Sequence, residues 1–344
     1  YSYLFINKLK ENWFKIKDFW YDMKPNSKRR IIYEFLIVPI KLTLFHQKDI
    51  IVLTSETYLP YTLFPFFPIQ NTLLIVQDVR DFSFTSQNPT LLQKIYFKLV
   101  HKWFKNLWHS KKTVTWSEFT RQQIKEIFWL PDSKLETIQN SFEFPSKEIF
   151  QKDKLSLRKE LLKKHWFEKL IDKKIILNVW SEEDRKNIKT LIKSVDGIKD
   201  VVLFKIWRPI IQSNRDEHLE LIKSCNTNVV FIDFVERADL DAFYYISDLF
   251  VYPSLFEGFG RTPLEAQIFG CPVISSDRWW LKEVLLDSAL ILQDPMDTAE
   301  IKQKIESVIS DENLKNDLIK KWFENCKRFD INNNYKKFIS ILSD

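Results

Sequence analysis

Residues 250–275 read Phe250-Val-Tyr-Pro-Ser-Leu-Phe-Glu257-Gly-Phe-Gly260-Arg-Thr-Pro-Leu-Glu265-Ala-Gln-Ile-Phe-Gly270-Cys-Pro-Val-Ile-Ser275. The apolar run that ends at Tyr252 predicts a buried strand, and a glycine-containing loop follows it. Pro263 then predicts the start of a helix, because proline is tolerated at the first helical position. The segment therefore predicts one strand–loop–helix unit of an α/β sheet.

This unit has the residues that an anion site needs. Gly258 and Gly260 let the backbone approach a ligand closely, and the first helical turn offers free N–H groups and the positive end of a helix dipole. Glu257 and Glu265 flank that turn. The combination suits a ligand with a diphosphate and several hydroxyls, such as a sugar nucleotide. A plain strand–turn–helix with capping acids is the alternative interpretation.

The surrounding C-terminal half alternates strands with helices. Predicted strands are Lys174–Val179, Val201–Trp207, Val229–Phe234, Leu249–Tyr252, Pro272–Ser275 and Ala289–Leu292. Predicted helices are Arg185–Val195, Glu217–Cys225, Leu240–Ser247, Pro263–Phe269 and Leu281–Leu286, followed by Thr298–Ile309 and Asn313 to Leu342. This alternation predicts a doubly wound parallel sheet, whose ligands bind beyond the carboxyl ends of the strands.

The N-terminal half also reads as α/β, although less clearly. Its strand candidates are Ile50–Thr54, Leu73–Val76, Thr113–Thr115 and Leu135–Ile138. We place the domain boundary in the polar stretch 145–154. The predicted domains are residues 1–147 and 148–325, with a C-terminal helical tail over 326–344.

Composition excludes several classes of protein. The 344 residues contain 4 glycines, where average usage of about 7% predicts roughly 24. Neither G-x-G-x-x-G nor a P-loop motif occurs, and three of the four glycines lie in the 13 residues from Gly258 to Gly270. The 3 cysteines form no C-x-x-C, which argues against a zinc ribbon or a disulfide scaffold. The sequence contains no run of about 18 apolar residues, so it predicts no membrane-spanning helix.

Charge is unevenly distributed along the chain. Residues 1–150 hold 21 Lys and Arg against 14 Asp and Glu, a net +7, and the remainder is −1, which gives the overall +6. The basic excess indicates an anionic partner for the N-terminal half: a membrane surface, a phosphorylated acceptor or nucleic acid.

The segment around Glu257 resembles glycosyltransferase family 4. The family signature E-x7-E matches Glu257 and Glu265 within a P-S-x-x-E-G-F-G context, and Arg185-Lys186-Asn187 resembles its basic motif after the preceding strand. The resemblance implies the GT-B fold, an α/β architecture of two facing Rossmann-like domains with parallel sheets. It also implies transfer from a nucleoside-diphosphate sugar to a glycan or lipid-linked acceptor, with retention at the anomeric carbon and without a metal or other cofactor.

The resemblance also implies roles for individual residues. Glu265 would hold the ribose hydroxyls and Glu257 those of the donor sugar. Arg185 and Lys186 would stabilise the departing diphosphate, together with the turn at Gly258, Phe259, Gly260, Arg261 and Thr262. The acceptor would enter near Gln77, Asp78 and Asp81. Gln77 departs from the family, which commonly has histidine there.

The family's N-terminal glycine loop is not visible in this sequence. We expect that loop, with the first strand, either to precede Tyr1 or to be lost. Two other functions therefore stay open. One is a catalytically degenerate GT-B protein that acts as a binding or scaffold partner, and the other is a sugar-nucleotide epimerase of the same fold.

Other patterns have simpler interpretations. Asp239 and Asp241 form a D-x-D, a metal signature of other glycosyltransferases, but we interpret them as acids at a helix start. The five histidines lack ligand spacing, so no metal is predicted. Leu91–Trp108 carries basic and aromatic residues, yet its four-residue repeat favours packing against a sheet over a flat membrane face. We expect a cytoplasmic protein with peripheral membrane contact through its basic N-terminal domain, and no nucleic-acid partner.

Overall fold

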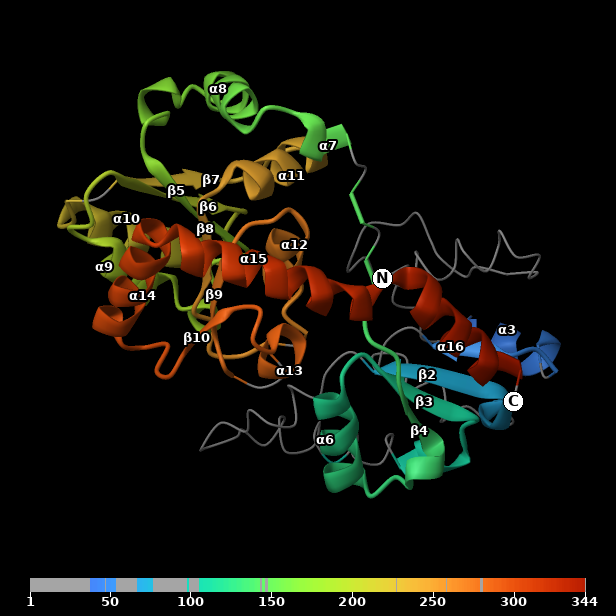
Figure 1. The fold of residues 1–344 in the computed structure, drawn as a ribbon. Coiled ribbons are helices and arrows are strands. Elements are labelled where there is room, and N and C mark those ends of the chain that lie inside the picture. The colour runs from blue at the N-terminus through green and yellow to red at the C-terminus, as the bar shows by residue number, and fades with distance from the viewer. Residues whose placement is uncertain are drawn as a thin grey trace. The chain divides into compact units, whose positions relative to one another are not determined.

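The computed structural model describes residues 38–46, 48–53, 67–76, 98, 105–142, 144–145, 148–226, 228–257, 259–278 and 281–343. These residues form two compact units (Figure 1). One contains the described residues before Glu143 together with the C-terminal helix, and the other spans Glu143–Asp330. The division lies at Phe142, where the sequence predicted residue 147. The last helix packs with the N-terminal unit instead of forming a separate tail.

The first unit has a parallel sheet whose described strands run in the order β1-β2-β3-β4. The strands are β1 (Ile51–Leu53), β2 (Thr72–Val76), β3 (Lys112–Thr115) and β4 (Leu135–Thr137), and the helices are α3 (Val38–Phe45), α6 (Glu118–Phe128) and α16 (Ile331–Ser343). Short 3-10 helices occupy Ile69–Asn71, Asn106–His109 and Asp132–Lys134. Ser117 caps α6 by accepting a hydrogen bond from the Thr120 amide. All four predicted strands are present.

The second unit has a six-stranded parallel sheet in the order β10-β9-β8-β5-β6-β7. Its strands are β5 (Lys174–Val179), β6 (Val201–Ile206), β7 (Asn228–Ile232), β8 (Leu249–Tyr252), β9 (Val273–Ser276) and β10 (Leu290–Leu292). Its first and fourth strands, β5 and β8, are neighbours, so the strand order reverses between them. Such a reversal is the usual ligand position in a doubly wound sheet. The predicted α/β fold is confirmed.

Helices cover both faces of the second sheet (Figure 1). They are α7 (Glu148–Gln151), α8 (Lys154–Lys164), α9 (Ile188–Val195), α10 (Gln212–Lys223), α11 (Arg237–Ile246), α12 (Arg261–Ile268), α13 (Leu281–Leu285), α14 (Thr298–Ser310) and α15 (Glu312–Cys326). Short 3-10 helices lie at Glu168–Leu170, Asp184–Lys186 and Lys327–Phe329.

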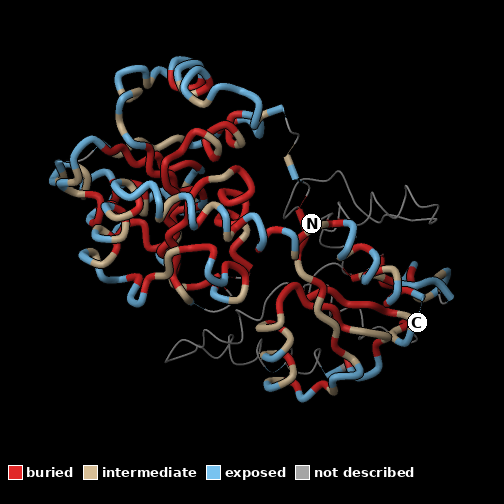
Figure 2. The backbone as a smooth tube through the Cα atoms, viewed as in Figure 1, coloured by how far each residue is buried: buried red, intermediate tan, exposed pale blue. Residues whose placement is uncertain are grey.

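Strand β6 illustrates how the core forms. Successive strand residues point to opposite faces. Leu203 belongs to the apolar cluster that α9 and α14 form on one face, and the ring of Phe204 lies 5.5 Å from that of Phe243 of α11 on the other. The four central strands are almost wholly buried, and the edge strands β7 and β10 are only partly so (Figure 2). This two-sided burial explains why their sequences are continuous apolar runs.

Several predicted helix starts differ from the structure. Helix α10 begins at Gln212 where the sequence predicted Glu217, and α11 begins at Arg237 where it predicted Leu240. The predicted helix Arg185–Val195 is a 3-10 turn at Asp184–Lys186 followed by α9, because Asn187 adopts a left-handed conformation with φ 58°. Asparagine tolerates this conformation better than most residues. Helix α12 begins at Arg261, so Pro263 is its third residue and not its first.

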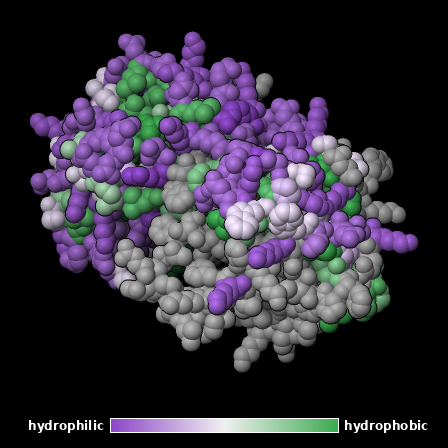
Figure 3. All heavy atoms as spheres, turned by 90° about the horizontal axis from the view of Figure 1, so that it is seen from below, coloured by the Kyte–Doolittle hydropathy of each residue, from purple (hydrophilic) through white to green (hydrophobic). Residues whose placement is uncertain are grey.

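On the face that Figure 3 shows, the described residues are mostly hydrophilic, with apolar groups between them. Among the described residues, none of the helices has the length and apolar character needed to cross a membrane.

Candidate active site

The candidate site lies in the second unit, where the carboxyl ends of β5 and β8 meet. After β5, the chain forms the 3-10 turn that holds Arg185 and Lys186. After β8, the loop from Pro253 leads past Glu257 to α12. The strand reversal thus brings the two sequence motifs together, although about 70 residues separate them.

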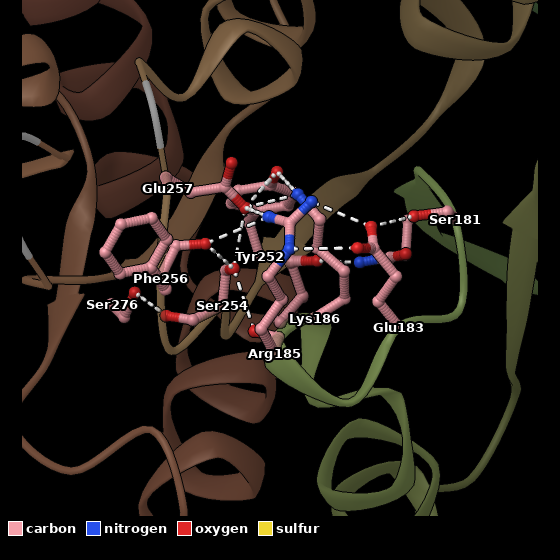
Figure 4. Close-up of polar contacts among 11 residues, drawn as sticks. Ser181, Glu183, Arg185, Lys186, Tyr252, Ser254, Phe256, Glu257 and Ser276 are labelled. Carbon is pink, nitrogen blue, oxygen red and sulfur yellow. Dashed lines mark hydrogen bonds and ion pairs between the residues drawn. The ribbon is translucent and has the colours of Figure 1, made fainter. Parts of the chain in front are cut away.

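Glu257 is the centre of a buried polar cluster (Figure 4). Its Oε1 accepts hydrogen bonds from Lys186 Nζ at 2.5 Å, Ser254 Oγ at 2.6 Å and Tyr252 OH at 2.7 Å. The Lys186 ammonium also donates to Tyr252 OH at 3.0 Å. The other carboxylate oxygen, Oε2, has no hydrogen-bond partner among the described residues and points away from the cluster (Figure 4). It is therefore available as an acceptor for a ligand hydroxyl.

Burial dominates the electrostatics of this cluster. Lys186 is 2% exposed and Glu257 is 6% exposed. Burial lowers the pKa of Lys186 from its ordinary 10.5 to about 8, although the charge of Glu257 opposes the change. Burial and the same carboxylate raise the pKa of Tyr252, which keeps its hydroxyl protonated as a donor. The Lys186 ammonium lies 4.5 Å from the centre of the Trp180 ring, a cation–π contact.

Arg185 links the two sides of the site. Its Nη1 donates to the Phe256 carbonyl at 3.1 Å, and its Nη2 donates to Glu183 at 2.7 Å. Its own carbonyl accepts a hydrogen bond from the Leu255 amide at 2.7 Å and lies 3.0 Å from Ser254 Oγ. The side chain keeps 22% exposure, so the guanidinium can still meet a ligand.

Asn187 completes this link. Its Nδ2 donates to the Pro253 carbonyl at 3.1 Å and the Pro295 carbonyl at 2.6 Å. The left-handed turn at Asn187 therefore ties the β8 loop to the segment after β10. The sequence motif indicated phosphate binding by its first two residues, but it gave no indication of this structural role for the third.

The turn before α12 depends on Gly260. This residue has φ +77°, and a Cβ there would lie 2.3 Å from Leu281 Cδ2. Phe259 is 9% exposed and packs edge-on against Phe329, with ring centroids 5.9 Å apart. Thr262 is buried in the first turn of α12. Gly258 lies outside the described residues.

Glu265 forms a second carboxylate cluster one helical turn into α12. Its Oε1 accepts hydrogen bonds from Arg261 Nε at 2.6 Å and Arg237 Nη1 at 3.4 Å, and its Oε2 accepts one from Tyr244 OH at 3.1 Å. Burial, with the nearby Glu265 charge, raises the pKa of Tyr244. No sequence motif indicated Arg237 or Tyr244, which reach Glu265 from α11.

A further buried charge network adjoins the site. Glu182 accepts hydrogen bonds from Arg215 Nε at 2.8 Å, and its Oε2 lies 2.9 Å from His218 Nδ1. Lys205 is fully buried, donates to the Trp180 and Trp207 carbonyls, and has its pKa lowered to about 7 by burial. The one indication of this buried network in the sequence was a lysine inside the apolar strand Val201–Ile206.

The remaining candidates fall elsewhere. Gln77, Asp78 and Asp81 lie outside the described residues, directly beyond the end of β2 and shortly after it. Most of Leu91–Trp108 is likewise outside them; its end forms the 3-10 helix Asn106–His109. No group of three or more His, Cys, Asp and Glu side chains in the described residues is arranged to hold a metal ion.

Asp239 lies in the first turn of α11, near the helix start as predicted, and Asp241 is the fifth residue, but neither caps the helix. The N-cap is Glu236, and its side chain makes no capping hydrogen bond. Asp239 instead pairs with Lys164 at 2.7 Å and His165 at 2.9 Å, and Asp241 pairs with Arg237 at 2.8 Å. Lys164 and His165 reach Asp239 by long-range packing, which local sequence signals did not reveal, whereas Arg237 lies one helical turn before Asp241.

Known proteins resemble both the sequence and the fold. Residues 163–324 match the family model described as "Glycosyl transferases group 1". The O-antigen chain mannosyltransferase B of Escherichia coli is 25% identical over 289 residues, which cover 82% of this chain and 71% of that protein. The serotype-specific mannosyltransferase WbdA of E. coli is 31% identical over 145 residues, 40% of this chain, and the match spans only 18% of WbdA.

A solved structure extends the likeness over both units. The Anabaena protein Alr3699/HepE, crystallised in complex with UDP, has a TM-score of 0.75 and 16% identity, with 89% of this chain and 82% of that chain covered. At this identity the likeness shows the fold alone, and it confirms the predicted GT-B architecture. The segment that matches the family model contains Arg185, Lys186, Glu257 and Glu265, the motif residues from which the sequence analysis inferred the family.

Proposed function

We propose that this chain, whose residues 163–324 match the family model of group 1 glycosyl transferases, transfers a mannosyl unit from a nucleoside-diphosphate sugar to a growing polysaccharide or lipid-linked glycan. Transfer retains the anomeric configuration and needs no metal. The reaction takes place at the carboxyl ends of β5 and β8.

The buried contact between Lys186 and Glu257 carries this proposal. The Lys186 ammonium and the Arg185 guanidinium are both held beside Glu257, at 2.5 Å and 3.7 Å from its Oε1. Negative charge develops on the diphosphate as the sugar leaves, so cations held in place beforehand favour the transition state over the ground state. Arg185 supplies a planar fork for two phosphate oxygens, and Lys186 supplies a point charge.

Glu257 positions the donor sugar. Three donors fix its Oε1, so the carboxylate cannot rotate freely, and Oε2 faces away from them (Figure 4). In this proposal, Oε2 accepts a hydrogen bond from a sugar hydroxyl, and Glu265 accepts hydrogen bonds from the ribose. The acceptor enters beside Gln77, Asp78 and Asp81.

The choice of mannose rests on relatives. Two of the similar proteins are named mannosyltransferases, and one of them acts on the O-antigen chain according to its name. The metal-independent route is supported by the pairing of Asp239 and Asp241 with cations, which leaves this D-x-D engaged within the protein. The basic N-terminal half fits an anionic membrane surface, so we place the protein in the cytoplasm, peripheral to the membrane.

A donor screen followed by a transfer assay tests the proposal. GDP-mannose, UDP-glucose, UDP-galactose and UDP-N-acetylglucosamine are compared by thermal shift, since a bound ligand raises the unfolding temperature. The stabilising donor is then incubated with lipid-linked oligosaccharide, and NMR gives the anomeric configuration of the product. We expect GDP-mannose to stabilise the protein and the product to retain the configuration. Binding without transfer would favour the scaffold function, and donor conversion without an acceptor would favour an epimerase.

A further inference from the structure

One oxygen of the Glu265 carboxylate already accepts hydrogen bonds from two arginines. Oε1 accepts hydrogen bonds from both Arg261 and Arg237, which occupy the two lone pairs of that oxygen. The Glu265 side chain is 7% exposed, whereas Arg261 is 34% exposed and lies on the solvent side of the pair. A ribose that approaches Oε1 of Glu265 from solvent must therefore compete with Arg261 and with Arg237, whose side chain is 57% exposed.

Arg261 occupies an unusual position for a cation. It is the first residue of α12, where the positive end of the helix dipole disfavours positive charge and favours an anion. The sequence order of the Arg261–Glu265 pair is also unfavourable, because an acidic residue four positions before a basic one stabilises a helix better than the reverse. Helix stability therefore does not explain an arginine here. A bound anion at the same helix end would offset both effects.

The reach of the side chain fits such an anion. Side chains of a helix lean toward its N-terminus, so the Arg261–Glu265 pair lies at the end of α12 that follows Gly260. That end is where the proposed function puts the diphosphate. Arg261 would exchange the Glu265 carboxylate for a phosphate by a change of side-chain rotamer.

We propose that Arg261 is a phosphate-operated latch on Glu265. In the free protein, its guanidinium covers Oε1 of the carboxylate. A bound diphosphate attracts the guanidinium away and frees Oε1 for the ribose hydroxyls, while Arg237 and Tyr244 keep the carboxylate in place. The latch rests on the proposed function, and it adds a specificity rule: the site accepts a ribose well only when a diphosphate accompanies it.

Paired titrations of diphosphates and nucleosides test the latch. UDP with uridine, and GDP with guanosine, are titrated into the wild type and into Arg261→Leu. A charge-assisted contact to phosphate predicts about a 10- to 100-fold loss of diphosphate affinity in the variant. Release of Glu265 from its ion pair with the partly exposed Arg261 predicts about a two- to fivefold gain in affinity for the nucleoside. The two affinities thus change in opposite directions.

Two further variants control for other effects. Arg261→Gln keeps a hydrogen-bond donor beside Glu265 but lacks the charge, so it should lose diphosphate affinity without a gain for the nucleoside. Arg237→Leu removes the same charge from the other side of the carboxylate, and it should change both affinities in the same direction. Unliganded melting curves establish that each variant is folded.

Each outcome decides between the alternatives. If Arg261→Leu changes both affinities in the same direction, or leaves their ratio unchanged, Arg261 is not a latch. If only diphosphate affinity falls, Arg261 binds phosphate but does not cover Glu265, and the latch is again wrong. If no diphosphate binds the wild type, the proposed function itself fails, which is distinct from failure of the latch.

Discussion

The buried ion pair between Lys186 and Glu257 should lower the stability of the protein. We consider the double substitution Lys186→Met with Glu257→Gln, which removes both charges and nearly preserves side-chain volume. Both residues are almost fully buried, and the pair lies at the proposed reaction centre. Replacement of buried ion pairs by uncharged residues of similar volume is often neutral or stabilising.

The magnitude follows from the pKa of Lys186. Burial lowers this pKa from 10.5 to about 8 even with Glu257 beside it. At about 1.4 kcal/mol per pH unit, the charged ammonium costs roughly 3 kcal/mol of folding free energy at neutral pH. We therefore expect the double variant to be more stable than the wild type by about 1–3 kcal/mol. Glu257→Gln alone leaves the ammonium buried without its counter-ion, and should lose about 3–5 kcal/mol.

Urea unfolding of the three proteins at several pH values is the assay. Because the pKa of Lys186 is lower in the folded state, the unfolded state binds more protons between pH 8 and 10.5. The wild type therefore gains stability relative to the double variant as the pH rises through that range, and the difference closes near pH 10.5. A double variant that is less stable than the wild type at pH 7 would refute this reasoning. So would a difference that does not depend on pH.

Three other predictions concern the turn, the pH profile and the metal. Gly260→Ala should lose about 2–4 kcal/mol of unfolding free energy, because alanine is strained in the left-handed conformation and its Cβ overlaps the buried Leu281. Gly270→Ala should lose only about 1–2 kcal/mol, because φ is +75° there but the space around it is open. Equal losses in thermal melts would contradict this. kcat/KM should fall up to about tenfold per pH unit above pH 8, where the Lys186 ammonium loses its proton, and a level profile to pH 9.5 would exclude that role. EDTA should leave the initial transfer rate unchanged; a loss that Mn²⁺ restores would show that a metal is needed.

The sequence predicted the fold of the second unit well for a physical reason. A parallel strand that is buried on both faces has to be apolar along its length, so each central strand was visible as a continuous run. The E-x7-E and R-K-N motifs were also visible, because each is contiguous in the chain. Their convergence at β5 and β8 follows from topology once the strand order is known.

The contacts that could not be predicted from the sequence depend on long-range packing. Tyr244 and Arg237 reach Glu265 from α11, more than 20 residues away, and neither belongs to a recognisable motif. Asp239 resembled a helix cap, but Lys164 and His165 approach it from the end of α8 and the residue that follows. Such pairs form only when two helices pack, so local spacing did not predict them.

The most direct test of the account is the initial rate of nucleoside-diphosphate release from GDP-mannose, measured with and without a lipid-linked oligosaccharide acceptor. We predict that the wild type releases the diphosphate in proportion to acceptor glycosylation, and that Lys186→Met lowers this rate by a factor of about 100 or more. Release that does not depend on the acceptor, or a Lys186→Met variant that retains the wild-type rate, would contradict the account.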